Sequence, residues 1–338
     1  MKHISTNVYR PGTCIANQSG VSLVELMIAM VISLILLGGV IQIVSNNKNS
    51  YNLQEGTSRL QQNARFAVDR IVQDLGAAGY MGCLDSADAD FPMFNDLTNQ
   101  AYGSAYDFGN AVFGTNGTGP NSSDTISIRR GSANGGIRLT APMADPTSPL
   151  QLDSADGAYA ALEQYDILVV GDCGNASVFM ITNDPTTSGG TIQHASGVTA
   201  ASGPNTGQSN ASGGIGYVYG AQTSSAGMAF QVGTLTYMLC PSIADNTRTS
   251  LFVNACGTAA NEIVEGVQDI QITYGLDTDT TLGADQYLDA SAITTPAQWS
   301  NVVSARITMT FDTVDPVPGG ALTKDFTTTI RLRNRGES

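Results

Sequence analysis

The feature that most constrains this chain is a long apolar run near its start, from Val21 to Val44. The run reads VSLVELMIAMVISLILLGGVIQIV, and its only charged residue is Glu25. As a helix, the part after Glu25 would extend roughly 29 Å, close to the ~30 Å thickness of the hydrocarbon core of a bilayer. The run therefore predicts a helix that spans a membrane.

The residues that flank the run distinguish it from an ordinary secretory signal. Such a signal has small residues at a cleavage site after its apolar part. Here a polar, weakly basic stretch ends in Gly20 before the run, and polar residues follow the run from Ser45 onward. We therefore expect the apolar run to stay attached to the mature protein.

Glu25 needs a partner if it lies within the membrane, because an unpaired carboxylate is costly there. Cleavage after Gly20 would create an amine at Val21, about one helical turn before Glu25. That amine, on the same subunit or on a neighbour, could neutralise the carboxylate. The alternative interpretation is that Glu25 simply lies in the headgroup layer.

Gly20 followed by Val-Ser-Leu-Val-Glu-Leu-Met resembles the class III leader junction of type IV prepilins and type II secretion pseudopilins. The resemblance implies that residues 1–20 are a leader peptide, which a prepilin peptidase removes after Gly20. It also implies that Val21 becomes the N-methylated terminus and that Glu25 governs assembly into the filament. Val21 stands where Phe is commoner in these families, a position that tolerates other apolar residues.

The helical pattern continues beyond the membrane segment. Apolar residues recur at spacings of three, four and seven from Leu53 to Leu75, and polar residues such as Asp74 should face away from that stripe. We expect one helix over residues 21–78, with 21–44 in the membrane. It should end at the glycines Gly76 and Gly79.

Short alternating runs bounded by turn residues follow, which predicts a β-rich periplasmic head over residues 79–338. A Gly- and Ser-rich segment, 185–227, predicts either a floppy surface insertion or a variable contact surface at a filament tip. The fold class is therefore α+β and pilin-like, with the long helix packed on a β-sheet-rich globular head. The expected strands are Thr125–Arg129, Asp166–Val170, Val178–Thr182, Tyr217–Tyr219, Leu235–Leu239, Val267–Tyr274, Ser304–Phe311 and Phe326–Arg333.

Two C-terminal stretches narrow the resemblance. One runs from Glu265 to Asp277 (EGVQDIQITYGLD) and leads to Trp299 and VVSARI, and the other is FTTTIRLRNR, which starts at Phe326. This arrangement resembles the PilW family of minor pilins, relatives of the J-type minor pseudopilins. Membership implies a subunit that primes type IV pilus assembly and stays near the pilus tip.

The resemblance also implies where the protein acts and with what. Before assembly it would sit in the bacterial inner membrane with its head in the periplasm, and afterwards in the pilus at the cell surface. The implied partners are other minor pilins, the major pilin, the prepilin peptidase, the inner-membrane assembly platform, inner-membrane lipid and a tip adhesin.

The chain has five cysteines, and their spacings fit no zinc template. If Cys14 leaves with the leader, four remain, which is typical of disulfides formed in an oxidising periplasm. We pair Cys240 with Cys256, which enclose a short loop after a strand, and Cys83 with Cys173. Four cysteines permit three connectivities.

Catalysis requires groups that the mature chain largely lacks. The full sequence has two histidines, His3 in the leader and His194 in the Gly/Ser-rich segment. It contains no phosphate-binding loop motif. Asp277, Asp279 and Asp285 could supply oxygen ligands to Ca²⁺, with Asp289 close by, but they do not meet the EF-hand pattern. We therefore expect no enzyme, no cofactor and a solvated acidic turn rather than a metal site.

Four other functions stay open on sequence grounds. They are a J-type pseudopilin of a type II secretion system, a tip adhesin, a DNA-uptake receptor and a membrane-anchored enzyme. The net charge of −14 argues against nucleic acid, because an acidic surface repels phosphates.

Overall fold

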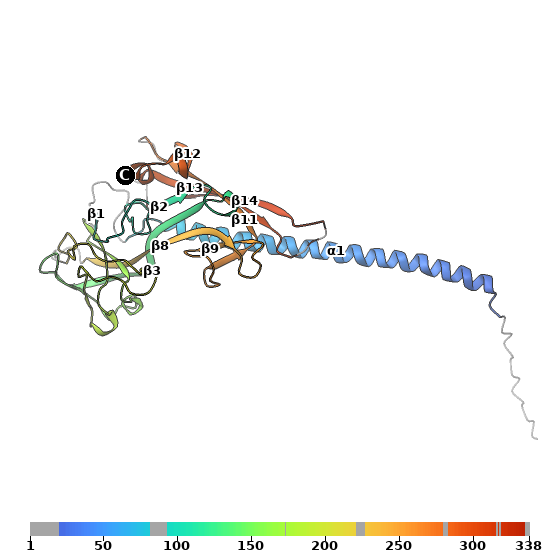
Figure 1. The fold of residues 1–338 in the computed structure, drawn as a ribbon, viewed down its shortest axis with the longest axis horizontal. Helices are drawn as coiled ribbons and strands as arrows, with labels where there is room; N and C mark the ends of the chain where they lie inside the picture. The colour runs from blue at the N-terminus through green and yellow to red at the C-terminus, as the bar shows by residue number, and fades with distance from the viewer. Residues whose placement is uncertain are drawn as a thin grey trace, which may run out of the picture. The chain divides into compact units, whose positions relative to one another are not determined.

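A computed structural model of the chain describes residues 20–81, 93–172, 174–220, 227–279, 283–315, 317 and 319–334. The chain forms two compact units, divided after Gln54. The described part of the first unit is mostly the start of one long helix, α1 (Leu23–Gly76), and the second unit holds the rest of α1 and two β-sheets (Figure 1). This architecture confirms the predicted α+β, pilin-like fold.

Within the second unit, α1 buries a stripe of side chains spaced three or four residues apart, as one face of a helix requires. Leu53 does not belong to the stripe, since it lies in the first unit and is 39% exposed. The helix ends at Gly76, and Gly79 follows with φ +74°, a conformation that glycine adopts without steric cost. The apolar residues of the stripe are Leu60, Ala64, Ala67, Ile71 and Leu75.

The larger sheet has ten strands in the order β1-β6-β5-β8-β3-β4-β7, to which β2, β9 and β10 are attached. Its pairings are antiparallel apart from β1 with β6. Its strands are β1 (Met93–Asn95), β2 (Val112–Thr115), β3 (Thr125–Ala141), β4 (Leu150–Leu152), β5 (Ile167–Gly171), β6 (Ala176–Met180), β7 (Thr191–Ile192), β8 (Met228–Pro241), β9 (Thr249–Val253) and β10 (Glu262–Glu265).

The smaller sheet is antiparallel and has the order β12-β11-β13-β14. Between β12 and β13 lies the short helix α2 (Pro296–Ser300), which begins with a capping box at Thr295 and buries Trp299 completely. The strands are β11 (Val267–Leu276), β12 (Gln286–Asp289), β13 (Val302–Asp312) and β14 (Thr323–Arg331).

Three hydrophobic cores hold the second unit together. The first joins the α1 stripe to residues of both sheets, including Leu239 of β8 and Ile307 of β13. The other two lie on opposite sides of β5, because successive side chains of a strand point to opposite faces. Leu168 thus belongs to the second core and Val169 to the third, and β5 is buried throughout.

Four of the eight predicted strands lie within observed ones, and Asp166–Val170, Val178–Thr182 and Phe326–Arg333 overlap observed strands but extend past one end. Tyr217–Tyr219 is not a strand, so that prediction is wrong: Tyr219 is a buried loop residue whose hydroxyl lies 2.6 Å from Ser177 Oγ. The strands that the sequence did not predict have five residues or fewer, namely β1, β2, β4, β7, β9, β10 and β12.

The Gly/Ser-rich segment is packed over residues 185–220, so the interpretation of a floppy insertion is wrong for these residues. Gln208 and Asn210 are buried there. The Asn210 side chain accepts a hydrogen bond from Met180 N at 2.7 Å and donates one to Met180 O at 2.8 Å. These bonds replace a strand partner at the end of β6.

Candidate functional site

The start of α1 is fixed by a capping serine. Ser22 Oγ accepts a hydrogen bond from Val24 N at 3.3 Å, and Ser22 O accepts the first helical bond, from Leu26 N, at 3.1 Å. Glu25 is therefore the third residue of the helix, where a carboxylate is favoured by the positive end of the helix dipole. Ser22 and Glu25 have the spacing of a capping box, a signal in the sequence that the prediction did not use.

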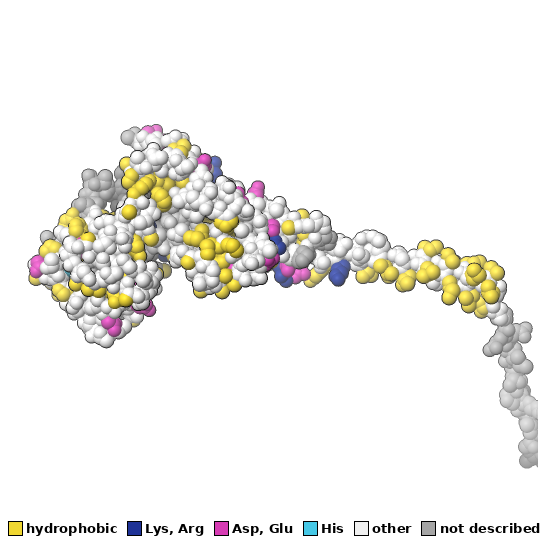
Figure 2. Space-filling model, in the orientation of Figure 1, with side chains coloured by type: hydrophobic (Ala, Val, Ile, Leu, Met, Phe, Trp, Pro, Cys, Tyr) yellow, Lys and Arg dark blue, Asp and Glu magenta, His cyan; other side chains and the backbone are white. Residues whose placement is uncertain are grey.

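The apolar run carries its side chains in the open. Residues 20–51 are all exposed, and Val21 is 71% exposed. Figure 2 shows the hydrophobic side chains crowded along this part of α1. By length and composition α1 could cross a membrane. The structure thus brings Gly20, Val21 and Glu25 together at one end of an exposed apolar helix.

So large an apolar surface does not remain in water, and lipid or other helices must cover it. Glu25 is the one charged residue between Gly20 and Val44. It would become a costly buried charge wherever lipid or helices enclose it, unless a cation lies near. The chemistry of this end of α1 is therefore charge pairing in an apolar environment.

A second ionic centre, at Asp74, fixes the other end of α1 to the larger sheet. Asp74 is 2% exposed, which corrects its prediction as a solvent-facing residue. Its Oδ1 lies 2.9 Å from Arg130 Nη2 of β3, and its Oδ2 lies 3.4 Å from Arg70 Nε and accepts a hydrogen bond from the Tyr237 hydroxyl of β8. Burial raises the pKa of Tyr237, so the phenol stays protonated and donates.

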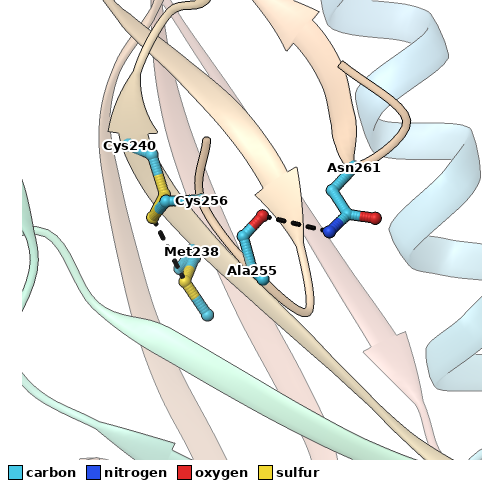
Figure 3. Close-up of a disulfide and its surroundings, with 5 residues drawn as sticks. All are labelled: Met238, Cys240, Ala255, Cys256 and Asn261. Atoms are coloured by element: carbon cyan, nitrogen blue, oxygen red, sulfur yellow. Dashed lines mark hydrogen bonds between the residues drawn. A yellow bond between two sulfur atoms is a disulfide. The ribbon is translucent and has the colours of Figure 1, made fainter. Parts of the chain in front are cut away.

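The structure joins Cys240 to Cys256 by a disulfide, the pair that the sequence predicted, with their Cα atoms 5.8 Å apart (Figure 3). Cys240 is buried in β8, whereas Cys256 lies in the exposed loop after β9. Cys256 Sγ lies 3.9 Å from Met238 Sδ, a sulfur–sulfur contact rather than a hydrogen bond, since a disulfide sulfur carries no proton. Cys83 and Cys173 lie outside the described residues.

The three acidic residues weighed as Ca²⁺ ligands do come together. Oxygens of Asp277, Asp279 and Asp285 lie within 4.8 Å of one another. Asp285 Oδ2 already accepts hydrogen bonds from Thr278 N at 2.6 Å and Thr278 Oγ1 at 2.9 Å. Asp289 stands apart, opposite Thr273 in the pairing of β12 with β11. We assign no ion here, and the solvated turn stays a prediction.

His194 is rigidly held, contrary to what its place in the Gly/Ser-rich segment suggested. It is 2% exposed, its Nδ1 lies 2.9 Å from Gly213 O, and its Nε2 lies 3.1 Å from Ser148 O. Both ring nitrogens therefore face backbone carbonyls. This buried side chain braces a loop and does not face solvent.

Two family comparisons bear on these features. Residues 15–41 match the prokaryotic N-terminal methylation motif, which covers Gly20, Val21 and Glu25. Residues 229–328 match the PilW family, type IV pilus-assembly protein W, from β8 into β14. The chain thus carries a PilW-family domain in its C-terminal third and a prepilin methylation motif at the start of its helix. No curated protein and no solved structure matches the chain.

The PilW match includes strands of both sheets and the Cys240–Cys256 disulfide. Pilin families are structural proteins of the type IV pilus, and a membrane-anchoring apolar helix behind a methylation motif suits that class. The strands β1 to β7 and the described part of 185–227 lie outside both matches.

Proposed function

We propose that this protein is a minor pilin that primes assembly of a type IV pilus and stays at or near its tip. It is not an enzyme in this proposal. A prepilin peptidase removes residues 1–20 and methylates the new terminus at Val21. The helix anchors the protein in the inner membrane with its head in the periplasm until it enters the filament, where other pilins surround it.

The observation that carries the proposal is the lone carboxylate of Glu25 on an otherwise apolar, fully exposed helix end. An amine at Val21, on this subunit or on its neighbour, would compensate that charge where water is excluded. Only a correctly cut and docked subunit then enters the filament without an unpaired charge. Platform proteins, the major pilin and other minor pilins are the partners that this step requires.

The decisive test replaces Glu25. With Glu25→Ala, we expect normal membrane insertion and normal leader cleavage, but roughly tenfold less of the protein in sheared pili, because docking loses its charge pair. Immunoblots of membrane and pilus fractions measure both amounts. Mass spectrometry of the mature terminus checks that it begins at Val21 and carries one methyl group.

Glu55→Ala is the matched control, since Glu55 lies on the same helix beyond the apolar run and pairs with Arg59 at 2.8 Å. It should enter pili at the normal level. Normal amounts of the Glu25→Ala protein in pili would refute the proposal, as would a mature protein that still begins at Met1.

A further inference from the structure

The long strand β8 pairs with β3 along one edge, with a register shift at Gln231, and its other edge is interrupted. β3 pairs with it from Met228 to Tyr237 on the first edge. On the other edge, β5 pairs with residues 228–231 and β9 pairs with residues 237–241. No described strand pairs with Gly233, Thr234 and Leu235 on that edge, and we call this interval the notch.

The backbone of Thr234 faces the notch. Its register partner on β3, Arg129, directs both backbone groups away from β8: its N–H donates to Ala111 O and its C=O accepts from Gly79 N. Two residues along β8, Thr236 is bonded to Asn254 through both its N–H and its C=O, on the β9 side. Because these directions alternate along an antiparallel strand, the Thr234 N–H and C=O also point to that side.

A cavity of about 580 Å³ lies at the notch. Nothing lies within 4 Å of where a Cβ on Gly233 would stand, so the space above the strand is open. Among the described residues, neither backbone group of Thr234 has a hydrogen-bond partner. The polar side chains around the cavity include Asp166, Asn205, Gln231 and Asn254.

Asp166 supplies a negative charge at the notch. Asp166 Oδ2 accepts hydrogen bonds from Gln231 Nε2 and Glu163 N, both at 2.8 Å, while its Oδ1 has no partner among the described residues. Burial raises the pKa of Asp166, because the carboxylate is partly removed from water. Arg130 also lines the cavity, but its guanidinium is directed to Asp74, 2.9 Å away, and forms no ion pair with Asp166 among the described residues.

The two ends of the notch hold strained backbone. Tyr165, which precedes Asp166, has φ +74°, and Asn254 has φ +67°. A bulky residue such as tyrosine rarely adopts this region, and such residues concentrate at sites that bind ligands. Asn205 Nδ2 donates to Tyr165 O at 2.9 Å and so holds this conformation beside the cavity.

We propose that the notch binds an extended, basic peptide segment of another protein, one residue of which pairs with Thr234 through both backbone groups. An extended residue presents the N–H and C=O that Thr234 lacks, as in strand addition to a sheet edge. The peptide residues before and after it direct their side chains to the face of β8 that carries Gln231. Asp166 lies on that face, so a lysine at either position pairs with its free Oδ1. The inference does not depend on the proposed function.

The probe is a capped pentapeptide, Thr-Lys-Thr-Lys-Thr, which carries a trifluoroacetyl group for ¹⁹F NMR and is titrated into the full chain in detergent micelles. We expect saturable binding. A second peptide with its central amide N-methylated should bind about tenfold more weakly, because it cannot donate to Thr234 O. A third peptide, with glutamate in place of both lysines, should also bind about tenfold more weakly.

Variants of the protein locate the site. Gly233→Trp fills the notch and should abolish binding, whereas Gly157→Trp, at another glycine with open space around it, should not. Asp166→Asn should remove the preference for lysine over glutamate while keeping the effect of N-methylation, which keeps the test decisive if Gly233→Trp fails to fold. Absence of saturable binding, equal binding of the N-methylated peptide, or full binding by a folded Gly233→Trp protein would overturn the proposal.

Discussion

Two buried tyrosines show how differently one hydroxyl can act in this protein. The Tyr237 hydroxyl donates to the buried carboxylate of Asp74, so it stabilises a charge that has little access to water. The Tyr274 hydroxyl is also buried, beside Trp299, but it has no hydrogen-bond partner among the described residues. A buried polar group without a partner costs stability, whereas one bonded to a charge contributes it.

Replacing each tyrosine by phenylalanine should therefore have unequal effects. Tyr237→Phe removes a hydrogen bond to a carboxylate and should lower the free energy of unfolding by about 2 kcal/mol. Tyr274→Phe removes only the unpaired hydroxyl and should change it by less than about 1 kcal/mol, toward greater stability. Urea denaturation of the two variants measures both, and equal losses would contradict this account of the Asp74 centre.

The residues at the two ends of α1 show why the sequence predicted one charged centre and missed the other. Gly20, Val21 and Glu25 stand in one short motif, so their proximity can be read from the sequence. Asp74, Arg130 and Tyr237 come from α1, β3 and β8, and only the tertiary fold brings them together. The prediction placed Asp74 on the outer face because it is charged, although its spacing of three from Ile71 and seven from Ala67 fits the buried stripe.

At the scale of elements, every described strand longer than five residues was at least partly predicted, whereas seven of the nine shorter ones were not. β11 and β13 have ten and eleven residues and alternate over most of their length, which identifies them in the sequence. β4 and β7 have three and two residues, too few for a period to appear. The prediction of a strand at Tyr217–Tyr219 was wrong because Tyr219 packs into the second core from a loop.

The Cys240–Cys256 disulfide ties the loop after β9 back to β8, which β9 already pairs with. The Cys240→Ser, Cys256→Ser double variant should lower the free energy of unfolding by about 3 kcal/mol, the chain entropy of a loop this short. Denaturation with and without reductant measures this. The wild type should lose as much in reductant, while the double variant should be unaffected, and equal stability of both proteins would exclude a bracing role.

At the scale of the whole molecule, the two units differ in the surface they present. The first carries the exposed apolar run, whereas the second buries most of its large apolar residues in three cores. The two also differ in how they can be identified. The run is visible as composition alone, but the second unit is defined by contacts between distant strands, which no local pattern contains.

A chain that begins at Asn46 should therefore be soluble without detergent, since it lacks the run that ends at Val44. Size-exclusion chromatography should give a monodisperse peak, and circular dichroism should show the β-rich spectrum of the head. A chain that begins at Val21 is the control and should require detergent. Aggregation of the Asn46 chain would mean that the head exposes apolar surface of its own.

The first core is closed by residues from opposite ends of the head: Leu60 of α1 meets a cluster that includes Ile330 of β14 and Leu332. Contacts so distant along the chain form late, because a long loop must close first. While the polypeptide leaves the ribosome, this core stays incomplete until translation reaches the last strand, although residues of β2, β3 and β8 are available earlier. Loss of β14 would therefore remove part of this core, rather than only trim one edge from a sheet.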